Sequence, residues 1–264
     1  MPTSLQISHA LDEMNKVKWG VDFSKYKAVF SGATKEVYEF EKDVHFGGRV
    51  QSHNRKPKRT GKRLGGIRRP FSIDRARQRI RRLISCNTSK MDIFCTFTFA
   101  DRTMKDIKTA NRHWTLFVKR LNTYLKFKVK YVAVVEFQPR SGVIHYHAVF
   151  FNLPYIPNDQ FAKIWSHGFI KMNAIKNIRN IGAYVSKYLQ KGVVDARLFN
   201  EKVYFASRGL VKPFITRLPP LDIDLSSFSS EIGQTAKYEL LKVSEYYSRW
   251  TGKIIYKIYN LITT

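Results

Sequence analysis

Cysteine and long apolar runs are scarce in this chain of 264 residues. The only two cysteines, Cys86 and Cys95, can form neither a disulfide framework nor a zinc site, which favours a reducing, intracellular compartment. No apolar run reaches the roughly 18 residues that a membrane-spanning helix needs. The first residues also lack the pattern of a secretory signal. We therefore expect a cytoplasmic protein with no membrane partner.

Acidic residues are the second shortage. Asp and Glu number 20 against 47 Lys and Arg, which gives a formal net charge of +27 and a pI near 10.1. Hydrophobic residues make up 44% of the chain, which is enough for a packed core and excludes global disorder. A polyanion relieves the self-repulsion of so many like charges, and nucleic acid is the usual one. We therefore expect a nucleic-acid partner.

The positive charge is concentrated between Arg49 and Arg82, where fourteen basic residues accompany one acid. Glycines and a proline predict a basic arm over residues 49–69. Apolar residues at helical spacing from Ser72 onward predict a helix with an arginine-rich face. We expect these side chains to contact the phosphates of DNA. The expected DNA-binding residues are Arg68, Arg69, Arg75, Arg77, Arg79, Arg81 and Arg82, together with Lys191 further along the chain.

Strand and helix patterns alternate along the rest of the chain. Two short strands are expected on either side of Ser31-Gly32. Further strands are expected at 93–99, 131–137, 143–151 and 169–172, helices at 106–125, 159–165 and 176–191, and an extended segment at 203–217. Residues 230–261 are expected to be helical, with Tyr238, Leu241, Tyr246 and Trp250 as packing residues. The predicted fold class is α+β, a central antiparallel sheet flanked by helices. The predicted parts are an N-terminal region with the basic arm (1–71), a central domain (72–225) and a C-terminal helical segment (226–264).

A metal-binding pattern lies in the two strands at 131–137 and 143–151. His145 and His147 are two residues apart in one strand, so both imidazoles point to the same face of the sheet. If Arg140-Ser141 form the turn, Glu136 lies directly opposite His145 on that face. Two nitrogens and a carboxylate, with no sulfur, can hold Mg²⁺, Mn²⁺ or Zn²⁺. The competing interpretation is an ordinary half-exposed sheet with a His–Glu hydrogen bond.

A second pattern is the pair Tyr184 and Tyr188 in the predicted helix 176–191. The four-residue spacing places both phenols on one helix face, and each has a lysine three residues on, Lys187 and Lys191. A nearby ammonium favours phenolate, and a metal ion can polarise a phosphodiester. A phenol, a neighbouring lysine and a metal ion together suit the attack of tyrosine on a DNA phosphate. The alternative is that both tyrosines only pack at the edge of the core.

Together these segments resemble a known family. The chain contains an apolar strand FCTFTF, a His-hydrophobic-His strand IHYHAVFF, a helix YVSKYLQK and a downstream SRGLVKP. This order is similar to the HUH endonuclease superfamily, specifically the rolling-circle replication initiators (Rep proteins), over about residues 75–213. The doubled tyrosine resembles the two-tyrosine initiators of phages and plasmids.

The resemblance implies a nickase that cuts one DNA strand at an origin and keeps the 5′ end on tyrosine. It implies Mg²⁺ or Mn²⁺ as cofactor, His145 and His147 as ligands, and Tyr184 as first nucleophile. Tyr188 would be a second nucleophile and Lys187 an assisting residue, while Glu136 as third ligand rests on the hairpin register. The implied fold is a central antiparallel sheet flanked by helices, and the implied partner is single-stranded DNA in a bacterial or archaeal cell.

No G-x-x-x-x-G-K-[ST] motif occurs, so no P-loop helicase is expected and a host or separate helicase must act with the DNA polymerase. Two alternatives remain at this point. One is a transposase or relaxase of the same superfamily. The other is a non-catalytic protein that binds single-stranded nucleic acid through its basic and aromatic residues.

Overall fold

The computed structural model describes residues 23–45, 70–89, 92–174, 201–202, 204–217 and 237–262. The chain divides into two compact units. The middle of the chain, Ile67–Leu210, forms one unit, and its two ends, Met1–Gly66 and Val211–Thr264, form the other. Within the described ranges, no helix is both long and apolar enough to cross a bilayer.

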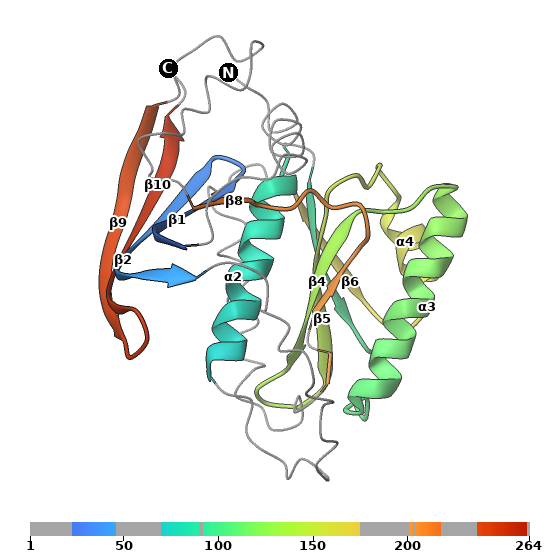
Figure 1. The fold of residues 1–264 in the computed structure, drawn as a ribbon. Helices are drawn as coiled ribbons and strands as arrows, with labels where there is room; N and C mark the ends of the chain where they lie inside the picture. The colour runs from blue at the N-terminus through green and yellow to red at the C-terminus, as the bar shows by residue number, and fades with distance from the viewer. Residues whose placement is uncertain are drawn as a thin grey trace, which may run out of the picture. The chain divides into compact units, whose positions relative to one another are not determined.

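The middle unit is built on an antiparallel sheet in the order β6-β3-β5-β4-β7. In Figure 1, α2 covers one face of this sheet, and α3 and α4 cover the other. The strands are β3 (Ile93–Thr98), β4 (Tyr131–Phe137), β5 (Ile144–Phe150), β6 (Ile170–Ala174) and β7 (Tyr204–Ala206). The helices are α2 (Pro70–Asn87), α3 (Ile107–Leu125) and α4 (Asn158–Trp165). This arrangement confirms the α+β class and the helix-flanked antiparallel sheet.

An aromatic core joins the sheet to α3. Trp114 of α3 stacks on Tyr146 of β5 with ring centroids 4.9 Å apart, and Phe97 meets the edge of Trp114 at 5.2 Å. All three side chains are fully buried, so they supply much of the apolar area that stabilises this layer. Asp106 caps the helix by accepting from the backbone N–H of Thr109 at 2.9 Å.

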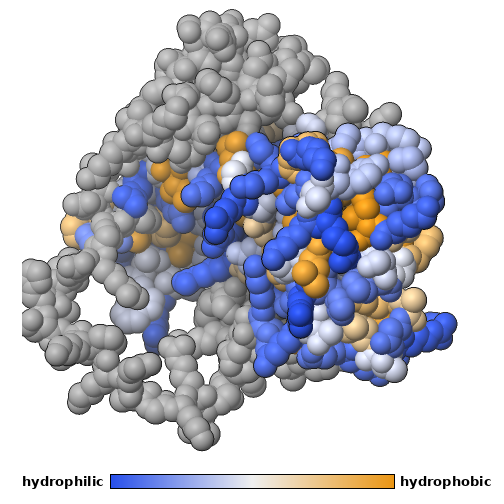
Figure 2. Space-filling model, turned by 90° about the vertical axis from the view of Figure 1, so that its right-hand side faces the viewer, coloured by the Kyte–Doolittle hydropathy of each residue, from blue (hydrophilic) through white to orange (hydrophobic). Residues whose placement is uncertain are grey.

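The outer surface of α3 is mainly hydrophilic, with small apolar areas between the charges (Figure 2). Lys108, Arg112 and Lys119 are exposed there, beside the partly exposed Leu116 and Tyr124. The helix therefore has the apolar inner stripe and polar outer face that its sequence predicts.

The opposite face of the sheet carries the histidines. Because successive side chains of a strand alternate in direction, β5 turns Tyr146 toward α3 and turns His145 and His147 toward the face that α2 covers. From α2, Ile80 and Ile84 are fully buried in the same core cluster, as the helical spacing predicts. The arginine-rich helix α2 and the two imidazoles therefore lie on the same side of the middle sheet.

The terminal unit is a second antiparallel sheet in the order β8-β1-β2-β10-β9. Its strands are β1 (Phe23–Ser31), β2 (Thr34–His45), β8 (Phe214–Thr216), β9 (Lys237–Ser248) and β10 (Gly252–Ile262). The expected hairpin around Ser31-Gly32 is confirmed, because Ser31 pairs with Thr34. The buried carboxylate of Glu36 accepts hydrogen bonds from the hydroxyls of Tyr38 at 3.1 Å and Tyr256 at 3.0 Å.

The expected C-terminal helix over residues 226–264 is wrong where the structure describes it, since β9 and β10 form a hairpin there. Leu241, Tyr246 and Trp250, expected to pack, are 58%, 45% and 76% exposed. Their spacing fits a helix, but the segment is rich in β-branched and aromatic residues and contains Gly252, whose φ of 72° suits a turn. Pairing of β10 with β2 decides the outcome.

Candidate active site

The β4–β5 hairpin places the candidate ligands. Glu136 pairs with His145 and Val134 with His147, so the expected register is confirmed. The turn holds this register because Gln138 N–H donates to Val143 O at 2.9 Å and Gly142 N–H donates to Gln138 O at 2.8 Å. Gly142 has a φ of 70°, a conformation that favours glycine. A slip of one residue would have moved Glu136 to the other face.

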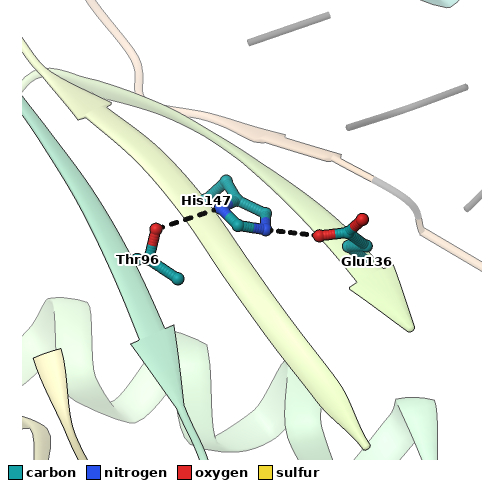
Figure 3. Close-up of polar contacts among 3 residues, drawn as sticks. All are labelled: Thr96, Glu136 and His147. Atoms are coloured by element: carbon teal, nitrogen blue, oxygen red, sulfur yellow. Dashed lines mark hydrogen bonds and ion pairs between the residues drawn. The ribbon is translucent and has the colours of Figure 1, made fainter. Parts of the chain in front are cut away.

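His147 is held from both sides by hydrogen bonds (Figure 3). Its Nε2 lies 2.6 Å from Glu136 Oε2, and its Nδ1 lies 3.1 Å from the hydroxyl of Thr96 on β3. Phe94, also on β3, stacks parallel to the imidazole with centroids 6.0 Å apart. His147 is 4% exposed and Glu136 6%, so the pair is largely removed from bulk water. Three neighbouring strands therefore fix the orientation of one imidazole.

The hydrogen-bond partners of His147 indicate which of its ring nitrogens can carry a proton. When the Glu136 carboxylate is ionised it can only accept, and His147 Nε2 is then the donor of this bond. The Thr96 hydroxyl is both donor and acceptor, so it can serve Nδ1 with or without a proton. Thr96 can therefore hold the ring in the same orientation in either tautomer. A buried imidazole fixed in this way resembles the ligands of metal sites, whose second nitrogen is also hydrogen-bonded.

His145 completes the row on the same face. Its ring centroid lies 6.4 Å from that of His147, and the side chain is half-buried. Burial lowers the pKa of His145, and the neighbouring His147 lowers it further, while Glu136 acts in the opposite direction. The neutral form, which carries the lone pair that a metal ion needs, is therefore favoured.

The candidate ligands do not form a ready-made metal site in the described residues. In the part of the chain that the structure describes, no three His, Cys, Asp or Glu side chains already surround a common point. His147 Nε2 and Glu136 Oε2 are instead in direct contact with each other. Two ligands about 2.1 Å from an octahedral ion and about 90° apart lie about 3.0 Å from each other. Opening the 2.6 Å contact by a few tenths of an ångström and releasing the Nε2 proton would bring the pair to that spacing.

The expected DNA-binding arginines of α2 lie on the helix that covers the histidine face. Arg75 and Arg79 are exposed, and Arg77, Arg81 and Arg82 are half-buried. Arg77 pairs with Asp74 at 3.3 Å, the acid of its own helix. The structure thus brings this basic helix and the candidate ligands to one side of the sheet.

Several expected site residues lie outside the described residues, with the predicted segments that carry them. They are Tyr184, Lys187, Tyr188 and Lys191 of the helix 176–191, and Arg68 and Arg69 of the basic arm 49–69. Their roles stay predictions. Thr96, in contrast, was not expected as a site residue. Its signal in the sequence is the alternation in IFCTFTF, which places Thr96 and Thr98 on the face opposite to Cys95 and Phe97.

Part of the chain matches a model of a known protein family. Residues 92–193, less than half of the chain, match the family model of the replication-associated protein ORF2/G2P. This match supports a replication initiator (Rep) family. The matched segment runs from β3 through β6 and includes both histidines, Glu136 and the two tyrosines of the predicted helix. No curated protein and no solved structure matches the chain. The relationship therefore associates the middle unit with DNA replication.

Proposed function

We propose that this Rep-like protein is a site-specific, metal-dependent nickase and strand transferase that initiates rolling-circle replication of a phage or plasmid. The observation that carries the proposal is the row of Glu136, His145 and His147 on one sheet face. It lies within the segment that matches a replication-associated family. The substrate is single-stranded DNA at a replication origin.

Tyr184 is the proposed first nucleophile. Its hydroxyl attacks the scissile phosphate, a phosphotyrosine bond forms with the 5′ end, and the 3′-oxygen leaves as a free hydroxyl that a polymerase can extend. Lys187, one helical turn away in the predicted helix, favours the phenolate form that attacks. Tyr188 is the proposed second nucleophile, which cuts again while the first 5′ end is still bound.

His145, His147 and Glu136 are the proposed ligands of Mg²⁺ or Mn²⁺. The ion would polarise the phosphodiester and offset the negative charge that develops on it. Thr96 keeps the His147 ring aimed along the row, because its hydroxyl bonds the far nitrogen. The arginines of α2 would hold the neighbouring phosphates of the strand, since they lie on the helix over the same face.

Transposases and relaxases of the HUH superfamily use the same chemistry on other DNA. The replication-associated match favours initiation of replication over these alternatives. A helicase and a DNA polymerase, from the host or encoded separately, are the proposed partners.

The test is formation of a covalent protein–DNA adduct. Single-stranded oligonucleotides tiled across the non-coding DNA of the replicon are incubated with the full chain and Mn²⁺, then separated on a denaturing gel. We expect a Mn²⁺-dependent adduct on one oligonucleotide. It should be lost in H147A and in the double variant Y184F/Y188F but kept in H45A, which removes an exposed histidine of β2. An adduct that persists in the double variant, or DNA that stays intact with the wild-type protein, would refute the proposal.

A further inference from the structure

The site face extends beyond the histidines to the edge strand β6. On one side, β3 pairs with β5, where Thr98 lies opposite His145 and Thr96 lies opposite His147. On its other side, β3 pairs with β6, and Thr96 lies opposite Lys171. Residues directly opposed in a sheet share a face. Lys171 therefore belongs to the row that contains His147.

Phe169 continues the neighbouring row. Thr98 N–H donates to Phe169 O at 2.9 Å, and Phe169 N–H donates to the Thr98 hydroxyl at 3.1 Å. The first of these bonds extends the β3–β6 ladder by one residue beyond the end of β6. Phe169 is thus placed opposite Thr98, which itself pairs with His145. One row therefore runs from Phe169 through Thr98 to His145. The other runs from Lys171 through Thr96 to His147.

Burial along the strand agrees with this placement. Ile170 is 1% exposed and faces the aromatic core, and Met172 packs against the same core. The alternate residues point the other way: Phe169 is 64% exposed, and Lys171 and Asn173 are also exposed. An aromatic ring and an ammonium therefore stand open beside each other on the site face. The ring of Phe169 is not part of the core cluster, so core packing does not account for it.

The backbone before Phe169 is closely fitted to β3. Gly168 has a φ of 156°, and a Cβ atom there would lie 2.4 Å from the backbone oxygen of Thr98. That same oxygen accepts from the indole N–H of the fully buried Trp165 at 2.9 Å. Phe169 is therefore presented from an anchored segment, which limits the conformational freedom lost on binding a ligand.

We infer that Phe169 and Lys171 form a subsite for single-stranded DNA, the edge subsite, in which a base stacks on the ring and a phosphate contacts the ammonium. The inference rests on the proposed function and extends it to specific residues. The backbones of neighbouring strands lie about 4.8 Å apart. The backbone of Phe169 is therefore about 10 Å from that of His145, which lies two strands away. A short stretch of one strand can span that distance.

Charge and chemistry favour nucleic acid as the occupant. The chain carries a net charge of +27, and the arginine-rich α2 covers the same sheet face. Single-strand binding sites combine a positive path for the backbone with aromatic rings for the bases. Phe169 beside Lys171 has this composition. Stacking does not depend on base identity, so the edge subsite holds the strand without selecting its sequence.

The experiment measures equilibrium binding of a fluorescein-labelled oligonucleotide of mixed sequence to the full chain, by anisotropy without divalent metal. F169A is expected to weaken binding by about 5- to 150-fold, the range of one lost base–aromatic stack, whereas F169Y keeps it. Y155A is the matched control, because Tyr155 is an exposed aromatic (87%) on the loop after β5. K171Q is expected to lower the slope of log affinity against log salt by about 0.7. K119Q, on the far side of the sheet, serves as its control.

Equal binding by F169A and the wild-type protein would overturn the edge subsite, as would an equal loss in Y155A. A protein partner on this surface would give the first of these results. Because the assay contains no metal and scores no cleavage, its result is separate from the nickase proposal. Loss of adduct formation in H147A with F169-dependent binding intact supports both proposals. Absence of any adduct with normal F169-dependent binding refutes only the nickase.

Discussion

The two sheets each bury a glutamate, and the two side chains have very different partners. Glu36 in the terminal sheet is 1% exposed and accepts from two tyrosine hydroxyls. Glu136 in the middle sheet is 6% exposed and bonds an imidazole nitrogen at 2.6 Å. A phenol keeps its proton at neutral pH, because its pKa is near 10. An imidazole titrates near neutrality and can exchange its proton for a metal ion. Burial alone therefore does not indicate function, whereas the partner's chemistry does.

The largest effect expected from this comparison is on His147. H147A removes a proposed ligand and the partner of Glu136, so we expect nicking to fall by more than about 100-fold. Even residues that only support a ligand are worth about 10–100-fold. The measurement is the initial rate of adduct formation with Mn²⁺, with H45A as control. A rate within a few-fold of wild type would mean that His147 is not a ligand.

Replacing each of the two glutamates by alanine in turn tests the comparison itself. E36A leaves the buried Tyr38 and the half-buried Tyr256 hydroxyls without this acceptor, so we expect a loss of about 2 kcal/mol or more in the free energy of unfolding. Its affinity for Mn²⁺ should be unchanged. E136A should weaken Mn²⁺ binding, and it should also lower the free energy of unfolding because it leaves the buried His147 Nε2 without this partner. Urea unfolding without metal and isothermal titration with Mn²⁺ give both values. If E36A weakened Mn²⁺ binding as much as E136A, the distinction would fail.

Thr96 allows a finer test. T96V keeps the shape of the side chain but removes the hydroxyl that bonds His147 Nδ1. We expect about 10-fold weaker Mn²⁺ binding, at the lower end of the range for residues that orient a ligand. T96S, which retains the hydroxyl, should bind Mn²⁺ as the wild type does. Equal affinities for T96V and T96S would show that the hydroxyl does not orient the ring.

The smallest effect concerns pH. Burial, aided by His147, lowers the pKa of His145, so the unfolded chain takes up its proton first as the pH falls. Below about pH 6.5, the ordinary pKa of histidine, protonation of His145 in the unfolded chain therefore lowers the free energy of unfolding. The ring resonances of His145, followed by NMR between pH 8 and 5 in the protein without metal, should give a midpoint under about 6.5. A midpoint above that value would contradict the lowered pKa.

The sequence predicts the β4–β5 hairpin well because its information is local. Alternation and a short turn are enough to place Glu136 opposite His145. Thr96 could not be predicted as a partner of His147, because that contact depends on the pairing of β3 with β5, some fifty residues apart. The Glu36–Tyr256 bond joins residues 220 positions apart, and the same long-range pairing converts an apparent helix into β9 and β10. Helical spacing in that segment is outweighed by strand pairing.

Binding of Mn²⁺ to the protein without DNA tests the central claim most directly. Electron paramagnetic resonance of the wild-type protein with one equivalent of Mn²⁺ should show a bound ion with couplings to two imidazole nitrogens. H145A and H147A should each lose one coupling, and E36A should keep both. A bound ion without imidazole coupling, or no bound ion at all, would contradict the assignment of Glu136, His145 and His147 as a metal centre.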